Sequence, residues 1–158
     1  MLNVLFVCTG NTCRSPMAEG VLRAQAELWG IGDRVRVDSA GMTRWHEGNE
    51  PTYEGQVAAA ARGYHIGDLR SRPVVSADFD TFDWIICMTR EHQQALRERR
   101  RSADQAQILL ASAFSPYLGT IDIVDPWGQG QAAYDTALDQ IEQCCADILV
   151  RVRASVAA

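Results

Sequence analysis

Short apolar segments alternate with helical patterns along this chain, and this alternation constrains its fold more than any other feature. Four segments have the composition of strands: Leu2–Cys8, Arg34–Asp38, Trp84–Met88 and Ile108–Leu110. Four others have helical periodicity: Ser15–Trp29, Thr52–Arg62, Glu91–Arg101 and Tyr134–Val152. Strands that alternate with helices predict an α/β fold, in which helices cover both faces of a parallel sheet.

The ends of these segments predict where a ligand binds. Ser15 has the residue type of a helix cap and Pro16 suits a first helical turn, so we expect the first helix to begin there. Residues 39–51 and 125–128 are predicted as loops. Ligands of parallel sheets bind beyond the carboxyl ends of the strands. Cys8, Ser39, Met88 and the loop before Asp125 lie at or near such ends, which places the expected site among them.

Length and composition fit one domain over residues 1–158. Hydrophobic residues make up 47% and charged residues 22%, which is ordinary for a globular protein. No apolar run approaches the length of a membrane span. Met1 leads straight into the apolar segment Leu2–Val7 without a basic region or a cleavage site, so we expect no secretory signal and a cytoplasmic location.

The charge pattern excludes several functions. A net charge of −5 argues against a nucleic-acid partner. The one basic cluster, Arg97 and residues 99–101, is interpreted as a solvated helix end. All 15 basic residues are arginine, so Schiff-base chemistry and the lysine-dependent nucleotide phosphate loop are excluded.

The five cysteines are interpreted as reduced thiols because the chain lacks a secretory signal. Cys8 and Cys13 have no second Cys or His pair at zinc-ligand spacing, and the three histidines are scattered singly. We therefore expect no metal and no cofactor, and the question becomes which cysteine reacts.

Residues 8–15 have the form Cys-x5-Arg-Ser, a pattern whose specificity depends on its context. Chance alone predicts about half a Cys-x5-Arg match in a chain of this composition, and Cys145 with Arg151 forms a second one. That second match lies in a strongly periodic helix, with Cys145 on its apolar stripe, and indicates core packing. The first match lies between a strand and a helix start.

That context suits an anion. The backbone N–H groups of residues 9–14 can wrap around it while the helix N-terminus faces it. Gly10 and Asn11 tolerate left-handed backbone angles, and Arg14 offers a planar fork to two phosphate oxygens. The same donors stabilise a thiolate at Cys8, which is a nucleophile. The alternative is a structural cysteine at a strand end.

The segment around Cys8 and several later motifs resemble those of a known family. Residues 4–19, Val-Leu-Phe-Val-Cys-Thr-Gly-Asn-Thr-Cys-Arg-Ser-Pro-Met-Ala-Glu, are similar to the signature of the low-molecular-weight protein tyrosine phosphatases. The likeness continues through residues 38–41, residues 45–48, the Asp125-Pro126 pair and the Cys144-Cys145 pair. It implies a four-stranded parallel sheet, and hydrolysis of phosphate monoesters through a cysteinyl-phosphate without metal or cofactor.

The resemblance also implies roles for single residues. Cys8 is the nucleophile and Arg14 clamps the phosphate, while Asp125 is the general acid for the leaving group and then the base for water. Without the family, Asp125 is equally well interpreted as a turn former. Ser15 donates to the thiolate, Asn11 shapes the loop through Ser39, and Cys13 captures an oxidised nucleophile as a disulfide. The expected phosphate- and substrate-binding set is Thr9, Gly10, Asn11, Thr12, Cys13, Ser15, Ser39, Trp45 and Trp127, with the two tryptophans as pocket walls.

The chain departs from the family pattern at three places. Leu69 stands where relatives usually have a His that bonds the loop asparagine, and Trp127-Gly128 stands where many have two tyrosines, so regulation by phosphorylation is not implied there. Thr12 replaces the usual apolar residue, as in relatives that act on phosphoarginine.

Three activities compete on this sequence. The first is hydrolysis of phosphotyrosine in a protein or peptide, with phosphate or another oxyanion held in the loop and no nucleic-acid or membrane partner. The second is hydrolysis of phosphoarginine. The third is thioredoxin-coupled arsenate reduction, which needs a mobile cysteine pair after the third strand, where only Cys87 lies near. Cys87 and Cys144 are expected to pack in the core.

Overall fold

A four-stranded parallel sheet forms the centre of the molecule. The computed structural model describes residues 1–119 and 121–157. The strands are β1 (Leu2–Cys8), β2 (Val35–Gly41), β3 (Trp84–Cys87) and β4 (Gln107–Leu110), and their order across the sheet is β2-β1-β3-β4. The predicted parallel sheet with four strands is therefore confirmed.

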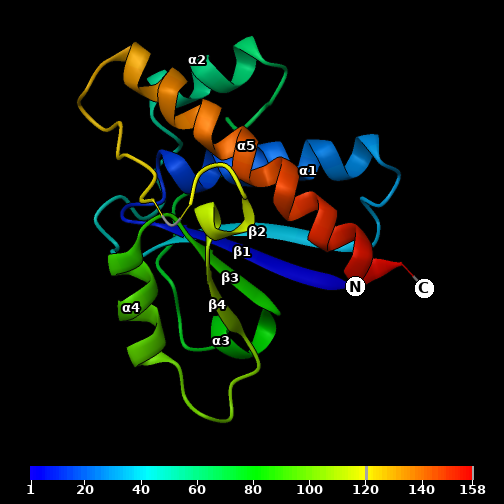
Figure 1. Ribbon diagram of the computed structural model, residues 1–158. Coiled ribbons are helices and arrows are strands. Elements are labelled where there is room, and N and C mark those ends of the chain that lie inside the picture. The colour runs from blue at the N-terminus through cyan, green and yellow to red at the C-terminus, as the bar shows by residue number, and fades with distance from the viewer. Residues whose placement is uncertain (120, 158) are drawn as a thin grey trace.

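Helices cover both faces of this sheet (Figure 1). Helices α1 (Arg14–Leu28) and α5 (Gln131–Val156) lie together on one face, with α2 (Tyr53–Ala61) packed against them. The short α3 (Asp78–Thr81) and α4 (Arg90–Arg99) lie on the other face. A 3₁₀ helix, η1 (Ala111–Phe114), follows β4.

Strand β1 shows why two cores form. Its side chains alternate, so that Val4 and Phe6 join the cluster under α1 and α5, whereas Leu5 and Val7 join the cluster under α3 and α4. All four are fully buried, as expected for a strand in the middle of a parallel sheet. The strand ends at Cys8, which continues the first cluster.

Several details differ from the sequence prediction. Residues 39–41 extend β2 instead of opening a loop, because β1 continues to Cys8 and pairs Cys8 with Gly41. Helix α1 begins at Arg14 with Cys13 as its N-cap, so Ser15 is not the cap. The one-turn α3 and η1 were not predicted, since four residues are too few for a recognisable helical period.

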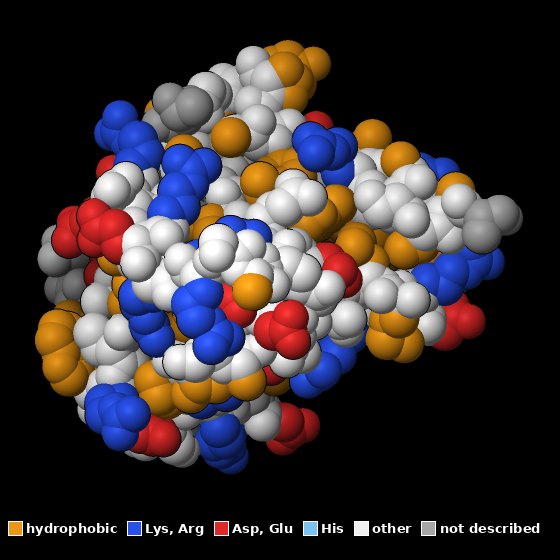
Figure 2. Space-filling model, turned by 90° about the horizontal axis from the view of Figure 1, so that it is seen from below, with side chains coloured by type: hydrophobic (Ala, Val, Ile, Leu, Met, Phe, Trp, Pro, Cys, Tyr) orange, Lys and Arg blue, Asp and Glu red, His pale blue; other side chains and the backbone are white. Residues whose placement is uncertain are grey.

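Charged groups are spread over the surface. Arg97 and Arg99 lie in the last turn of α4 as predicted, but Arg100 and Arg101 lie beyond the helix and bind the turn at Asp104. On the face shown in Figure 2, arginines are interspersed with acidic side chains. Within the described residues, no helix is both long and apolar enough to cross a membrane.

Candidate active site

The carboxyl ends of β1, β2 and β3 meet at one edge of the sheet, and the loop after Cys8 is folded there. Asn11 adopts the left-handed conformation, with φ of 56°. Gly41 lets the loop pass close to β2, because a Cβ at this position would lie 3.0 Å from the carbonyl oxygen of Thr9. Helix α1 begins at Arg14, so its N-terminus faces the loop.

The carbonyl groups of this loop are turned outward to donors in the surrounding chain. Because N–H and C=O point in opposite directions across a trans peptide, the N–H groups that follow these carbonyls are turned to the inside of the loop. An inward ring of N–H groups at a helix N-terminus is a cradle for an anion. The outward pairs are Cys8 O with Met42 N at 2.9 Å, Thr9 O with Thr43 N at 3.0 Å, Gly10 O with Ser71 Oγ at 2.8 Å, and Thr12 O with Thr52 N at 3.0 Å.

A chain of hydrogen bonds behind the loop ends on the Cys8 sulfur. Ser39 Oγ donates to the buried Glu19 carboxylate at 2.7 Å, so its oxygen is left to accept from Asn11 Nδ2 at 3.0 Å. Asn11 Nδ2 also donates to Ser15 Oγ at 2.8 Å. Ser15 Oγ therefore has its own hydrogen left to donate, and Cys8 Sγ at 3.0 Å is nearer than its other acceptor, the carbonyl oxygen of Ala40 at 3.4 Å. This is the arrangement that suits a thiolate.

Glu19 and Arg72 fix the far end of that chain. Burial raises the pKa of the Glu19 carboxyl, against the opposing effect of the bonds from Ser39 and Arg23. The backbone N–H of Arg72 donates to Asn11 Oδ1 at 3.0 Å. Leu69 packs against the core and takes no part in this network. The amide orientation of Asn11 is thus set from both sides.

Arg14 and Asp125 meet at the opening of the loop. Arg14 is 3% exposed, and its Nη1 donates to the carbonyl oxygen of Ile123 at 2.8 Å. Ile123 is held there because its N–H donates to the carbonyl oxygen of Met88 at the end of β3. Arg14 Nη2 lies 3.6 Å from Asp125 Oδ2, while Asp125 Oδ1 accepts from Trp127 N at 3.1 Å. The Asp125 carboxylate therefore stabilises the turn at residues 125–127 with one oxygen and faces Arg14 with the other.

A cavity of about 340 Å³ opens over the loop. Trp45 and Trp127 lie at its rim and are 76% and 56% exposed, and His46 packs beside Trp127 with ring centroids 6.3 Å apart. Asn11, Ser15 and Ser39 do not line the cavity, because they form the network behind it. The lining residues are Cys8, Thr9, Gly10, Thr12, Cys13, Arg14, Trp45, His46, Asp125 and Trp127.

The sequence prediction missed His46, Glu19 and Arg72 in this region. His46 follows Trp45 directly, and Glu19 lies one helical turn after Ser15, so both had a positional signal. Arg72 had none, since it bonds Asn11 through its backbone N–H and any residue other than proline offers that group.

The five cysteines are all free thiols and all buried. Cys13 Sγ lies 3.2 Å from the Tyr134 hydroxyl, and burial raises the pKa of its thiol. Burial raises the pKa of Cys87 and of Cys144 to about 12. The predicted core positions of Cys87, Cys144 and Cys145 are confirmed by their burial.

Comparisons with known proteins point to one family. A family profile described as low molecular weight phosphotyrosine protein phosphatase matches residues 3–158. A low molecular weight protein-tyrosine-phosphatase from Streptomyces coelicolor is 35% identical over 156 residues, which cover 97% of this chain and 94% of that protein.

Solved structures agree with this. A protein tyrosine phosphatase from Entamoeba histolytica superposes with a TM-score of 0.92 at 30% identity, over 98% of this chain and 99% of the other. An arginine phosphatase from Drosophila superposes with a TM-score of 0.88 at 31% identity, over 95% and 97%. Since the match spans nearly the whole chain in sequence and in fold, the chain belongs to the low molecular weight phosphotyrosine protein phosphatase family and is a hydrolase.

Proposed function

We propose that this protein removes phosphate from phosphotyrosine in proteins or peptides, with Cys8 as the nucleophile. The observation that carries the proposal is the hydrogen bond between Ser15 Oγ and Cys8 Sγ at the base of a cavity that Arg14 and Asp125 also line. A thiolate that accepts a hydrogen bond below an anion cradle is placed for attack on a bound phosphoryl group.

The first step transfers the phosphoryl group to Cys8. The sulfur attacks phosphorus, so that an S–P bond forms while the P–O bond to the tyrosine oxygen breaks. The loop N–H groups and Arg14 hold the three phosphoryl oxygens as charge shifts onto them. Asp125 gives its proton to the departing phenol oxygen, because a phenoxide leaves poorly without one.

The second step hydrolyses the cysteinyl-phosphate. Asp125, now ionised, takes a proton from water as the water oxygen attacks phosphorus. The S–P bond breaks, inorganic phosphate is released and the Cys8 thiolate is restored. Asp125 is placed for both steps because its side chain is half exposed at the cavity opening, where it can reach the leaving group and water.

The rim supports an aromatic substrate. Trp45 and Trp127 are largely exposed beside the opening, and a phenol ring can stack on an indole. The family profile and the relative from Streptomyces coelicolor carry phosphotyrosine or tyrosine phosphatase in their descriptions, which favours the same substrate here.

Phosphoarginine is the second candidate substrate, and Thr12 is the observation in its favour. Thr12 lines the cavity, and its hydroxyl can accept a hydrogen bond from a guanidinium N–H. The Drosophila arginine phosphatase has nearly the same fold. In this case the P–N bond breaks and Asp125 protonates the departing nitrogen.

Arsenate reduction is the weakest of the three activities. It requires a mobile cysteine pair after the third strand, but Cys87 is the last residue of β3 and is fully buried. We place the protein in the cytoplasm, which fits five free thiols. We also propose that Cys13 forms a disulfide with Cys8 when Cys8 is oxidised.

The test is turnover of p-nitrophenyl phosphate in the presence of a chelator, followed by phosphotyrosine and phosphoarginine peptides assayed side by side. We expect chelator-resistant turnover and a higher kcat/KM on the phosphotyrosine peptide. A preference for the phosphoarginine peptide would make phosphoarginine the substrate in place of phosphotyrosine. Turnover only of arsenate with thioredoxin would overturn both proposals.

A further inference from the structure

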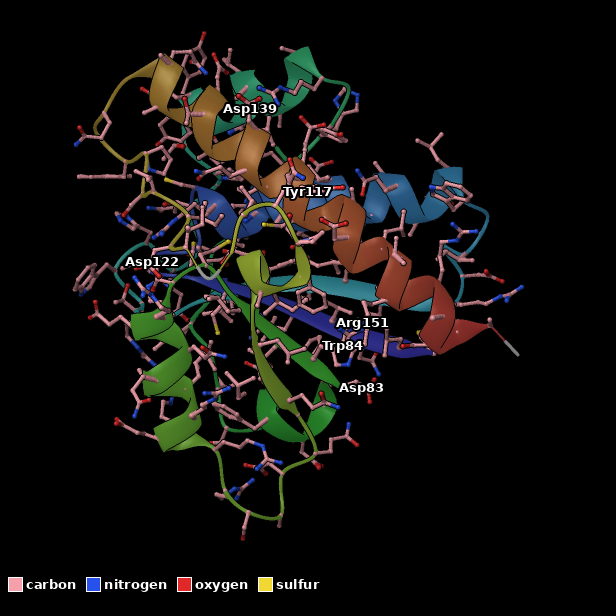
Figure 3. All side chains as sticks on the ribbon, in the orientation of Figure 1. Asp83, Trp84, Tyr117, Asp122, Asp139 and Arg151 are labelled. Carbon is pink, nitrogen blue, oxygen red and sulfur yellow. The ribbon has the colours of Figure 1, made fainter. Side chains whose placement is uncertain are left out.

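His92 is a buried imidazole that the mechanism above does not use. It lies in the first turn of α4, is 8% exposed and is not part of the cavity lining. Its place is fixed by the helix start, where its backbone N–H donates to Thr89 Oγ1 at 3.1 Å. Asp122 accepts from the backbone N–H of Arg90 at 2.8 Å and lies beside the same helix start (Figure 3).

His92 is connected to Arg14 through one hydroxyl group. His92 Nε2 lies 2.9 Å from Thr9 Oγ1, and the same oxygen accepts from Arg14 Nη2 at 3.3 Å. A second anchor of the guanidinium is Nη1, which donates to Ile123 O at 2.8 Å. A planar group held by one hydrogen bond can turn about it, whereas two bonds fix its plane.

The surroundings determine the charge and tautomer of His92. Burial and the nearby Arg14 lower its pKa to about 4, against the opposing effect of Asp125 and Asp122, so the ring is neutral near pH 7. Its Nδ1 is buried and has no hydrogen-bond partner within residues 1–119 and 121–157. A buried N–H without an acceptor is rarer than an acceptor without a donor. Nε2 therefore carries the hydrogen and donates it to Thr9.

We propose that His92 is a positioning residue for the phosphatase reaction, which holds the Thr9 hydroxyl and thereby fixes the plane in which Arg14 meets the phosphoryl group. The inference rests on the proposed function. With a donor from His92 on one side and from Arg14 on the other, the Thr9 oxygen has both lone pairs engaged. If His92 loses its donor, the Thr9 side chain can rotate and Arg14 keeps one hydrogen-bonded anchor.

The experiment compares two replacements of His92 with matched controls. His92→Leu keeps apolar bulk without a donor, and His92→Gln keeps an uncharged N–H near the position of Nε2. His65→Leu removes an exposed histidine that does not line the cavity, and it controls for the substitution itself. Each variant is assayed for kcat and KM on p-nitrophenyl phosphate and for inhibition by vanadate, with circular dichroism as the check on folding.

We expect His92→Leu to lower kcat about tenfold, because Arg14 binds the phosphoryl group more strongly in the transition state than in the ground state. Inhibition by vanadate should weaken in parallel. His92→Gln should recover most of this loss, and His65→Leu should equal the wild type. A folded His92→Leu protein with wild-type kcat and vanadate inhibition would overturn the inference, as would equal losses in the Leu and Gln variants.

Thr9→Val tests the same link if His92→Leu does not fold. It removes the shared hydroxyl while keeping the shape, and it should lower kcat by about the same factor. Where His92→Leu folds, the double variant His92→Leu with Thr9→Val should be no slower than Thr9→Val alone, because the hydroxyl that His92 holds is already gone. Additive losses, or a wild-type rate for Thr9→Val, would overturn the inference. An inactive wild-type protein would instead refute the proposed function.

Discussion

The floor of the site and its rim are built in opposite ways. The floor is the loop of residues 8–15, in which some side chains line the cavity and others form the network behind it, and the rim is Trp45, His46 and residues 125–127. On the floor, Asn11 is held from both sides by hydrogen bonds, and Ser15 is fully buried. On the rim, Trp45 is 76% exposed and the Asp125 side chain is half exposed.

This difference separates two requirements of catalysis. Donors that stabilise a transition state must already be in place, which favours a buried loop that the surrounding protein holds in one conformation. A rim that receives varied peptides, and a carboxylate that exchanges protons with the leaving group and water, need access to solvent. We therefore expect substitutions on the floor to affect the chemistry of every substrate, and substitutions on the rim to affect substrates unequally.

Cys8→Ser should produce the largest effect, a loss of measurable turnover on every substrate. The serine hydroxyl is a far weaker nucleophile than a thiolate, but the loop N–H groups and Arg14 remain. Binding of phosphate or vanadate, measured by calorimetry, should therefore be largely retained. Substantial turnover by the pure variant would show that Cys8 is not the nucleophile, and loss of anion binding would show that the floor depends on the sulfur for its shape.

Asp125→Asn changes a rim residue, and the loss of activity should depend on the leaving group of the substrate. The amide keeps the size of the side chain and can still accept from Trp127 N, so the turn should survive, but it has no proton to give. General acid catalysis is worth about 10²- to 10⁴-fold. We expect a loss of that size for substrates with basic leaving groups and a much smaller one for p-nitrophenyl phosphate. An equal loss across a series of aryl phosphates would mean that Asp125 only forms the turn.

Thr12→Ile tests the one floor residue expected to discriminate between substrates. Thr12 Oγ1 lies 3.7 Å from Cys13 Sγ, and its lone pairs remain available to a substrate N–H when it donates to that sulfur. An isoleucine would leave a guanidinium N–H unpaired, at a cost of about 1 to 3 kcal/mol, or roughly a ten- to hundredfold change. Activity on phosphoarginine should fall by that factor relative to phosphotyrosine. Parallel losses on both peptides would make Thr12 a loop-shaping residue.

The sequence predicted the main elements of the fold and the floor because both depend on local patterns. Apolar runs predicted the strands, and the turn at Gly10 and Asn11 between a strand and a helix predicted the anion loop. The predicted start of α1 at Ser15 was wrong because the Ser15 hydroxyl bonds Cys8 instead of capping the helix. A tertiary contact thus overrode a local preference.

The connections behind the floor could not be predicted for a different reason. His92 and Thr9 are 83 residues apart, and their contact depends on which side of α4 packs against the loop. Arg72 acts through a backbone N–H, which residue type does not encode. Glu19 had a positional signal one helical turn after Ser15, but its bond to Ser39 became evident only once Ser39 was known to lie in β2. Such links require the sheet order, and the sequence alone did not supply it.

Trp45→Ala should give the smallest effect and the clearest separation of rim from floor. Trp45 is mostly exposed, so its removal should leave the loop and the thermal midpoint nearly unchanged. A stacking contact with a substrate ring is worth about 0.5 to 1.5 kcal/mol, or roughly two- to twelvefold. If the contact is the same in the ground and transition states, the loss appears in KM while kcat stays constant. We expect this KM increase on a phosphotyrosine peptide and a smaller one on a small alkyl phosphate, which has no ring to stack. A fall in kcat of the same size on both substrates would mean that Trp45 helps to position the floor, and the division between a rigid floor that carries the chemistry and an open rim that selects substrates would then not hold.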